Sequence, residues 1–281
     1  MSDPSTAPMR HLTERHTAEL AYHRERARTI AAVGPTPDGT LERYRRHRLW
    51  RLFPKEFMFK CLGEIAGKSI LDFGCGEGKL TTQLARLGAQ VTGFDISPEL
   101  IAIAQRRAVL DGVQDCVGFL LADGAESELA EDMFDAIICQ AVLHRVDIFQ
   151  VVPRLVRSLR PGGIVIMVEP VDFSLTYQRI RHLIPIAKVG SPSARQLGRD
   201  EVAFLLGTLT KSRVEFFNLF GRLARLLPNR NKIDHGHPFT RTAIVLLLSV
   251  DRFLLTLFPF LWRLCGTVVI VGTKPAAGSA A

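Results

Sequence analysis

The sequence lacks several features that would assign it to a particular class at once. Its five cysteines are scattered and odd in number, and none belongs to a Cys-x-x-Cys pair. Neither a disulfide framework nor a structural zinc site is therefore indicated. The first residues, 1–8, contain no apolar core of a signal peptide, and no internal repeat or low-complexity tract is present. We expect a reduced, cytoplasmic protein with no metal ion.

No uncharged apolar run reaches the ~20 residues that a membrane-crossing helix needs. The two most apolar segments, residues 243–250 and 253–262, are separated by Asp251 and Arg252, and Pro259 interrupts the second. A transmembrane segment is therefore not expected. For residues 239–262 three roles stay open: the wall of an apolar pocket, a peripheral membrane contact, and the face of a homodimer.

Charge is distributed unevenly along the 281 residues, whose formal net charge is +8. Residues 61–170 carry 9 basic and 15 acidic side chains, so the excess of positive charge lies in the flanking segments. Basic flanks are compatible with an anionic small molecule, an anionic membrane surface or nucleic acid. They are equally compatible with an arginine-rich surface that only contacts water.

Apolar strands and amphipathic helices alternate strictly from residue 68 onward. Short, nearly continuous apolar runs such as residues 136–139 and 164–168 are typical of parallel strands that are buried on both faces. The pattern predicts a doubly wound α/β core. We expect strands at 69–73, 90–95, 116–121, 134–140 and 163–169, and helices at 77–88, 98–112, 125–131 and 147–159.

The segments around this core predict additions to a single catalytic domain. Residues 1–63 are expected to form an N-terminal helical cap, with a basic helix over 40–60 that Pro54 interrupts. Residues 64–170 form the core, and residues 171–212 a lid followed by a helix. Residues 213–281 supply the last strands, with a hydrophobic helical insertion at 221–265.

A glycine-rich turn follows the first predicted strand. Gly74, Gly76 and Gly78 interrupt an apolar run that resumes as a helix. Such glycines let the backbone turn tightly and lie close to a ligand, while the amides that open the helix face the same space. One helix later, a second apolar strand ends in Asp95, where an acceptor for ribose hydroxyls is expected. The pair indicates a nucleotide-type cofactor.

Five motifs in this order resemble those of class I S-adenosylmethionine-dependent methyltransferases. They are Asp72–Gly78, Phe94–Ser97, Ala122–Ala125, Phe134–Ile138 and Leu159–Gly163. The resemblance covers residues 64–170, with residues 266–274 as a final strand. It implies a Rossmann-like, mostly parallel sheet of seven strands and S-adenosylmethionine as the cofactor. The cofactor contacts that it implies are Asp72, Gly74, Cys75, Gly76, Asp95, Ile96, Asp123, Gly124 and Gln140.

Two other protein classes fit the motifs less well. A nicotinamide-binding fold also uses a glycine-rich turn, but Gly78 stands one residue early for Gly-x-Gly-x-x-Gly. A nucleic-acid methyltransferase is disfavoured because residues 140–143, after the fourth strand, read Gln-Ala-Val-Leu. The Asn/Asp-Pro-Pro-Tyr-type tetrapeptide that would resemble base-methylating enzymes is absent there. A SAM-binding module without turnover stays open as another class.

Within the resemblance, His144 follows the fourth strand and is the candidate general base, because imidazole titrates near neutral pH. Its alternative role is packing beside the cofactor. Glu169, at the end of the fifth strand, is expected either to contact the acceptor or to pair with an arginine of the lid. Tyr177, Arg181 and His237 are further candidate substrate contacts. We expect a small, largely apolar acceptor, with O-methylation favoured over C- or N-methylation of an isoprenoid, quinone or aromatic natural product.

Overall fold

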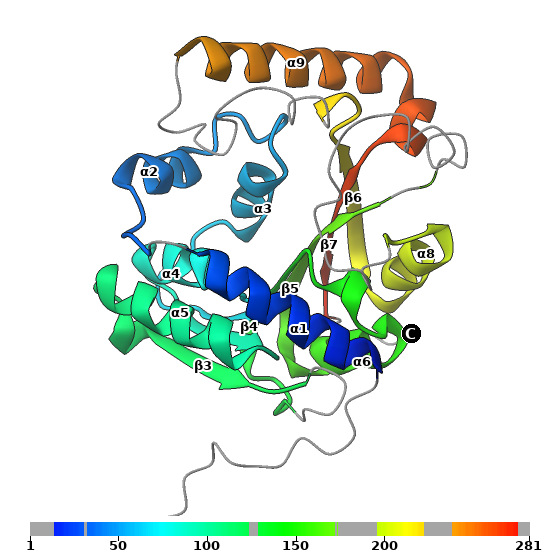
Figure 1. Ribbon diagram of the computed structural model, residues 1–281. Coiled ribbons are helices and arrows are strands. Elements are labelled where there is room, and N and C mark those ends of the chain that lie inside the picture. Colours follow the sequence, from blue (N-terminus) through cyan, green and yellow to red (C-terminus); the bar gives the residue numbers. More distant parts are fainter. Residues whose placement is uncertain are drawn as a thin grey trace, which may run out of the picture.

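A seven-stranded sheet forms the centre of the protein. The computed structural model describes residues 14–30, 33–123, 129–171, 173, 196–221 and 238–274. Across the sheet the strand order is β3-β2-β1-β4-β5-β7-β6, and β7 alone runs in the direction opposite to the other six strands (Figure 1). The strands are β1 (Ser69–Phe73), β2 (Gln90–Asp95), β3 (Val117–Leu121), β4 (Phe134–Gln140), β5 (Leu159–Pro170), β6 (Thr210–Phe217) and β7 (Thr267–Thr273). The doubly wound, mostly parallel sheet expected from the sequence is confirmed.

Helices cover both faces of this sheet. On one face, α3, α4 and α5 enclose a core around Phe57, Ile70 and Leu84, while on the other face α6 and α8 pack over Leu71 and Leu155. Strands β1, β2, β4, β5 and β7 therefore contribute buried side chains to both cores. The helices of the sheet layers are α3 (Pro54–Leu62), α4 (Lys79–Arg86), α5 (Pro98–Leu110), α6 (Ile148–Ser158) and α8 (Arg199–Thr208).

Strand order reverses between β1 and β4. Successive strands β2 and β3 lie on one side of β1, and β4 and β5 lie on the other. Parallel pairing places Phe73 at the end of β1 beside Cys139 near the end of β4. Chains that leave these two strands diverge to opposite faces and leave a crevice between them, which is where doubly wound sheets bind ligands.

The N-terminal part of the chain differs from the single interrupted helix expected over 40–60. Two helices occur instead, α2 (Asp38–Arg46) and α3. His47 takes a left-handed conformation with φ of 32° and ends α2, whereas Pro54 opens α3 at a position where its missing N–H is not needed. Before them, α1 (Glu14–Thr29) lies across the sheet between α4 and α6 (Figure 1).

The hydrophobic insertion forms α9 (Pro238–Leu257) and a short helix, η7 (Pro259–Leu264). Ile244 and Leu248 of α9 are buried against Phe53 in the segment that links α2 to α3. In the part of the chain that the structure describes, no helix combines the length and apolar character needed to span a membrane. The predicted helix at 125–131 lies partly outside the described residues, and its described end, residues 129–131, is not helical.

Candidate active site

Two adjoining cavities occupy the crevice at the carboxyl ends of β1, β2 and β4. Their volumes are about 310 Å³ and about 70 Å³. Both are lined by Gly74 and Asp95 from the sheet side and by His23 of α1 from the opposite side. Since the two cavities share these walls, together they form one elongated cleft, which we call the crevice site.

The glycine turn forms the floor of the crevice site. Gly74 has φ of +77°, and a Cβ at this position would lie 2.5 Å from the side chain of Val142 on the turn after β4. Gly76 has φ of +54°, and a Cβ there would meet nothing within 4 Å, so its backbone faces open space. The turn is tied to β2 because the amides of Gly74 and Cys75 both donate to the carbonyl of Phe94.

Asp95 joins the glycine turn to the end of β2. Its Oδ2 accepts a hydrogen bond of 2.8 Å from the Gly76 amide, and its Oδ1 accepts one of 2.9 Å from the Ser97 amide. Each carboxylate oxygen has a second lone pair. The carboxylate lines both cavities and is therefore placed to accept hydrogen bonds from a ligand with neighbouring hydroxyls.

The smaller cavity has mainly apolar walls. Phe73, Phe94, Ile96 and Ala122 line it, and Asp123 stands at its edge with its side chain largely buried. A flat aromatic group fits such a slot, with the aspartate as the polar group that fixes its orientation. Gly124, the other residue expected here, lies outside the described residues.

The larger cavity carries the more polar side chains. Asp72, Cys75 and Gln140 all line it, as expected from the sequence, and Lys55 of α3 joins them. The Asp72 carboxylate is buried and accepts a hydrogen bond of 2.6 Å from Thr81 Oγ1. Burial raises the pKa of Asp72 to about 6, although Thr81 and Lys55 act in the opposite direction. Burial also raises the pKa of the Cys75 thiol well above its ordinary value, so this cysteine is not a reactive thiolate.

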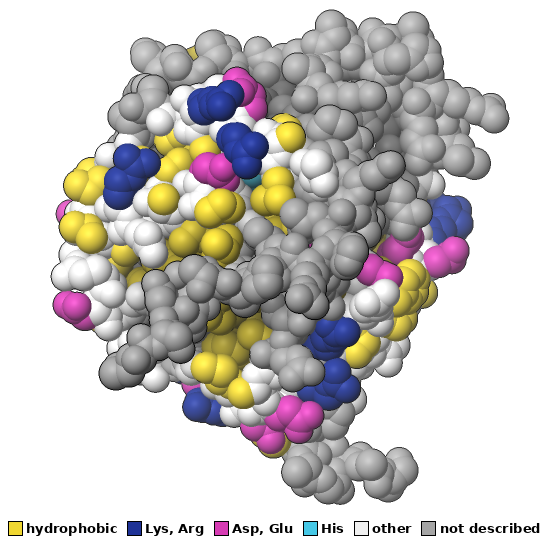
Figure 2. Space-filling model, turned by 60° about the horizontal axis from the view of Figure 1, so that its bottom comes forward, with side chains coloured by type: hydrophobic (Ala, Val, Ile, Leu, Met, Phe, Trp, Pro, Cys, Tyr) yellow, Lys and Arg dark blue, Asp and Glu magenta, His cyan; other side chains and the backbone are white. Residues whose placement is uncertain are grey.

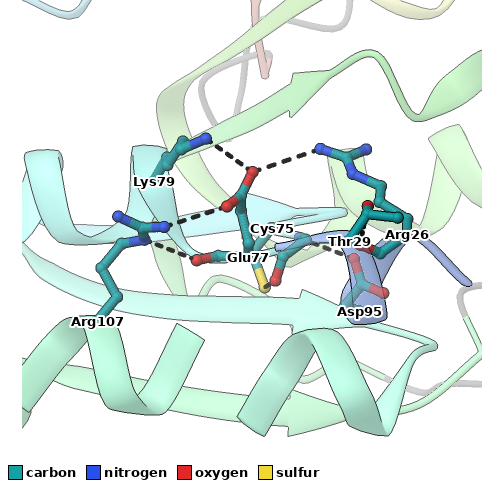
Figure 3. Close-up of polar contacts among 8 residues, drawn as sticks. Arg26, Thr29, Cys75, Glu77, Lys79, Asp95 and Arg107 are labelled. Atoms are coloured by element: carbon teal, nitrogen blue, oxygen red, sulfur yellow. Dashed lines mark hydrogen bonds and ion pairs between the residues drawn. The ribbon is translucent and has the colours of Figure 1, made fainter. Parts of the chain in front are cut away.

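Glu77 anchors the far side of the glycine turn, as Figure 3 shows. Its carboxylate meets Lys79 at 2.8 Å, Arg107 of α5 at 3.1 Å and Arg26 of α1 at 3.5 Å. Arg107 also donates to the Glu77 carbonyl at 3.0 Å. Burial alone would raise the pKa of Glu77, but Lys79, Arg107 and Arg26 together lower it below its ordinary value. The turn is thus held from α1 as well as from α5.

Helix α1 closes the outer side of the crevice site, a contribution that the sequence analysis missed. Glu19 and His23 line the cleft together with Arg145, whose guanidinium donates to Glu19 at 3.0 Å and lies 3.2 Å from His23 Nε2. The same Nε2 lies 3.4 Å from Glu19 Oε2. The other ring nitrogen, Nδ1, is buried without a hydrogen-bond partner among the described residues. A buried, unpaired ring nitrogen beside a cleft indicates a ligand that pairs with it.

His144 is held in one orientation by Glu169. Its Nδ1 lies 2.8 Å from Glu169 Oε2, and Glu169 Oε1 accepts from the amides of Val142 and Leu143, each at 2.9 Å. On the other side of the ring, Arg145 Nε donates to Nε2 at 3.3 Å. The ring is thus contacted by a carboxylate at Nδ1 and by a guanidinium at Nε2.

The position of Glu169 differs from the acceptor contact expected of it. The side chain is fully buried, and neither Glu169 nor His144 lines either cavity. Among the described residues, the side-chain partner of Glu169 is this histidine and not an arginine of the lid. Both carboxylate oxygens of Glu169, at the end of β5, are hydrogen-bonded to residues of the turn after β4. Tyr177, Arg181 and His237 lie outside the described residues. Within the described ranges, no three His, Cys, Asp or Glu side chains cluster as a metal site.

The sheet order, the glycine turn and Asp95 at the end of β2 agree with what the resemblance to class I S-adenosylmethionine-dependent methyltransferases implies. Residues 71–167 match the family model described as a methyltransferase domain. The recognition made from the five motifs is thereby confirmed.

Relatives of known name match a little over a third of the chain. Methyltransferase GfsG of Streptomyces halstedii is 39% identical over 110 residues, which are 38% of this chain and 40% of the relative. The ubiquinone biosynthesis O-methyltransferase of Xanthomonas axonopodis pv. citri is 39% identical over 101 residues, or 36% of this chain and 42% of the relative. The matched region thus spans less than half the length of these relatives.

Solved structures share the fold across nearly the whole chain. The geranyl diphosphate C-methyltransferase of Streptomyces coelicolor A3(2), in complex with Mg²⁺, geranyl diphosphate and S-adenosyl-L-homocysteine, has a TM-score of 0.61 at 15% identity, covering 95% of this chain and 100% of that one. The [4+2]-cyclase SpnF has a TM-score of 0.57 at 19% identity, covering 94% and 97%. A methyltransferase and a cyclase share this architecture, so the fold alone does not define the reaction.

The raised pKa of the buried Asp72 carboxylate can be tested by measuring how protein stability depends on pH. Its pKa lies above that of an unfolded chain, so the folded protein holds the extra proton and Asp72 lowers the unfolding free energy as pH rises from about 4 to about 6. A rise from 3.8 to about 6 corresponds to about 3 kcal/mol at full effect. Asp72→Asn should therefore stabilise the protein by ~1–3 kcal/mol at pH 8 and by much less at pH 4, as measured by urea unfolding.

The exposed Asp115 provides the control for this measurement. Asp115→Asn should change stability little at either pH. If Asp72→Asn were no more stabilising at pH 8 than at pH 4, the carboxylate would not be held in the raised-pKa environment described above.

Proposed function

We propose that this chain binds S-adenosylmethionine in the crevice site and transfers its methyl group to a small, largely apolar acceptor, with O-methylation as the favoured reaction. The observation that carries the proposal is the joint placement of Asp95, the glycine turn and Asp123 around one elongated cleft. Relatives named as ubiquinone biosynthesis O-methyltransferases support the acceptor class.

The residues of the cleft fit the chemical groups of this cofactor. The apolar slot beside Ile96 suits adenine, with Asp123 as the acceptor for the exocyclic amine. The Asp95 carboxylate suits the two ribose hydroxyls, and the open space over Gly76 admits the rest of the molecule without a side chain in the way. Asp72 and Gln140 would face the methionine end. His23 Nδ1 would gain the hydrogen-bond partner that it lacks.

S-adenosylmethionine supplies a methyl group that is already electrophilic, so the protein mainly has to position the acceptor and exclude water. An oxygen acceptor also needs to lose its proton. We assign this step to His144, because Glu169 holds the Nδ1 proton and leaves the Nε2 lone pair on the opposite side of the ring. Arg145 Nε, at 3.3 Å from Nε2, has to move aside for that transfer.

Carbon methylation of an isoprenoid is the second candidate function. It is favoured by a cluster of aromatic rings next to the end of β5, in which Trp262 lies 5.0 Å from Phe216 and 5.3 Å from Phe173 between ring centroids. Aromatic faces stabilise a developing positive charge. Neighbours in fold include geranyl diphosphate methyltransferases, which at 15% and 18% identity support the architecture alone.

Cofactor binding is tested by Asp95→Ala. Hydrogen bonds to an ionised group contribute ~1.5–3 kcal/mol each, so loss of two predicts an affinity for S-adenosylmethionine that is ~10²-fold weaker or more in calorimetry. Asp135→Ala, at the opposite end of the sheet, should leave the affinity unchanged. Unaltered binding by a folded Asp95→Ala protein would rule out the ribose assignment.

The acceptor class is tested with methyl-labelled S-adenosylmethionine and two probes, a prenylated catechol and geranyl diphosphate. We expect label in a methyl ether of the catechol, with His144 as the proposed base for the hydroxyl proton. Label on a carbon of geranyl diphosphate would instead establish the second candidate. Binding of the cofactor without transfer to either probe would contradict both acceptor assignments.

The base is tested with the acceptor that becomes labelled. His144→Ala should lower kcat by ~10²-fold while leaving cofactor affinity near that of the unsubstituted protein. Glu169→Gln keeps the size of the side chain but removes the charge that orients the ring, and should shift the pH profile of kcat as well as lower it. A loss of tenfold or less in His144→Ala, with an unshifted profile in Glu169→Gln, would assign His144 a packing role.

A further inference from the structure

Helix α9 carries an apolar face that no other described element covers. Leu246, Val250, Phe253 and Leu257 recur at helical spacing along one side, and Leu246 and Phe253 are each 65% exposed. Beyond the end of the helix, Phe260 and Leu264 of η7 are exposed as well. Figure 1 shows α9 lying along the outer edge of the molecule, above α2 and α3. We call this set of residues the α9 face.

The opposite side of α9 faces the protein. Ile244 and Leu248 pack there against Phe53, and Asp251 is buried with its carboxylate bonded to the amides of Phe220 and Gly221. The one acidic residue of the helix is therefore turned inward. An exposed stripe that contains no charge, opposite a side that is already packed, is the pattern of a helix resting on an apolar phase.

Arginines gather beside the α9 face. A cavity of about 340 Å³ lies between α2 and α9, and its walls combine Arg46, Arg48 and Arg241 with the apolar Leu49 and Val245. Arg45 and Arg51 are also exposed on this part of the chain. Of the acids in the cavity wall, Glu56 is buried in an ion pair with Arg43, and Glu42 pairs with Arg46.

On the face of the molecule in Figure 2, Lys and Arg side chains lie close to Asp and Glu side chains, with hydrophobic ones among them. In the region around α9 and α2, an apolar stripe lies next to a group of arginines. Because these cations outnumber the nearby acids, the surface is complementary to one that is apolar inside and anionic at its rim.

We infer that the α9 face rests on an anionic phospholipid bilayer, with the stripe in the acyl boundary and the arginines against lipid phosphates. A second copy of this chain is a poorer occupant, because a two-fold contact through this face would bring the exposed arginines of both copies together. The helix lies on the membrane and does not cross it, because no helix among the described residues is long and apolar enough to span a bilayer. The inference is independent of the proposed methyl transfer.

The test is co-sedimentation of the full chain, without cofactor, with vesicles of phosphatidylcholine alone or of phosphatidylcholine and phosphatidylglycerol in equal parts. We expect binding to the anionic vesicles, weakened by added salt, and little binding to the neutral ones. Phe253→Glu places a charge in the middle of the stripe and should weaken binding at least ~10-fold. Val109→Glu, on α5, is the matched control, since Val109 is 64% exposed, and should bind normally.

A second set of variants tests the contribution of the arginines to vesicle binding separately from that of the apolar stripe. Arg48→Glu with Arg241→Glu should weaken binding to anionic vesicles at least ~10-fold, whereas Arg106→Glu on the exposed side of α5 should not. Circular dichroism and S-adenosylmethionine affinity confirm that each variant is folded. No sedimentation, equal binding to neutral vesicles, or equal loss in Val109→Glu would overturn the inference. So would a dimer that Phe253→Glu dissociates while vesicle binding is unaffected.

Discussion

The carboxylate of Asp95 is the interaction on which the rest of the site depends. It ends β2 and bonds at once to Gly76 in the glycine turn and to Ser97 at the start of α5. Ser97 in turn caps α5 by accepting from the Leu100 amide. One side chain therefore fixes the relative positions of a strand end, a loop and a helix N-terminus. Its remaining lone pairs face the cleft, so the group that shapes the site is also the group that would recognise the ligand.

Two further networks close the site around that centre. Glu77 holds the far end of the turn against α5 and α1, and Arg145 joins α1 to the imidazole of His144. A helix far from the catalytic motifs in sequence is thereby coupled to the candidate base through a single guanidinium. Movement of α1 would change both the outer wall of the cleft and the surroundings of Nε2. The same guanidinium thus contacts both the outer wall of the cleft and the imidazole.

Much of the fold followed from periodicity. Strands β1, β2 and β4 begin and end where the apolar runs predict, and the glycine turn, Asp72 and Asp95 lie where the motifs predict. These features are local, because a buried parallel strand needs a continuous apolar run and a tight turn needs glycine. Ser97 and Pro98 likewise mark the start of α5 by residue type alone. The boundary between α2 and α3 was missed, because His47 adopts a left-handed conformation that residue type alone did not indicate.

What the sequence by itself determined is the doubly wound core and the residues on its strand ends that line the cleft, because the backbone requirements of strands and tight turns act over a few neighbouring residues and are visible in the sequence. Only the tertiary structure decided that His23 and Arg145 line the cleft, that Glu169 stands behind His144, and that α9 packs on Phe53 and turns its other face outward. These contacts join segments far apart in the chain. Their physical basis is burial and pairing between elements, and neither leaves a signal in the spacing of residues within one element.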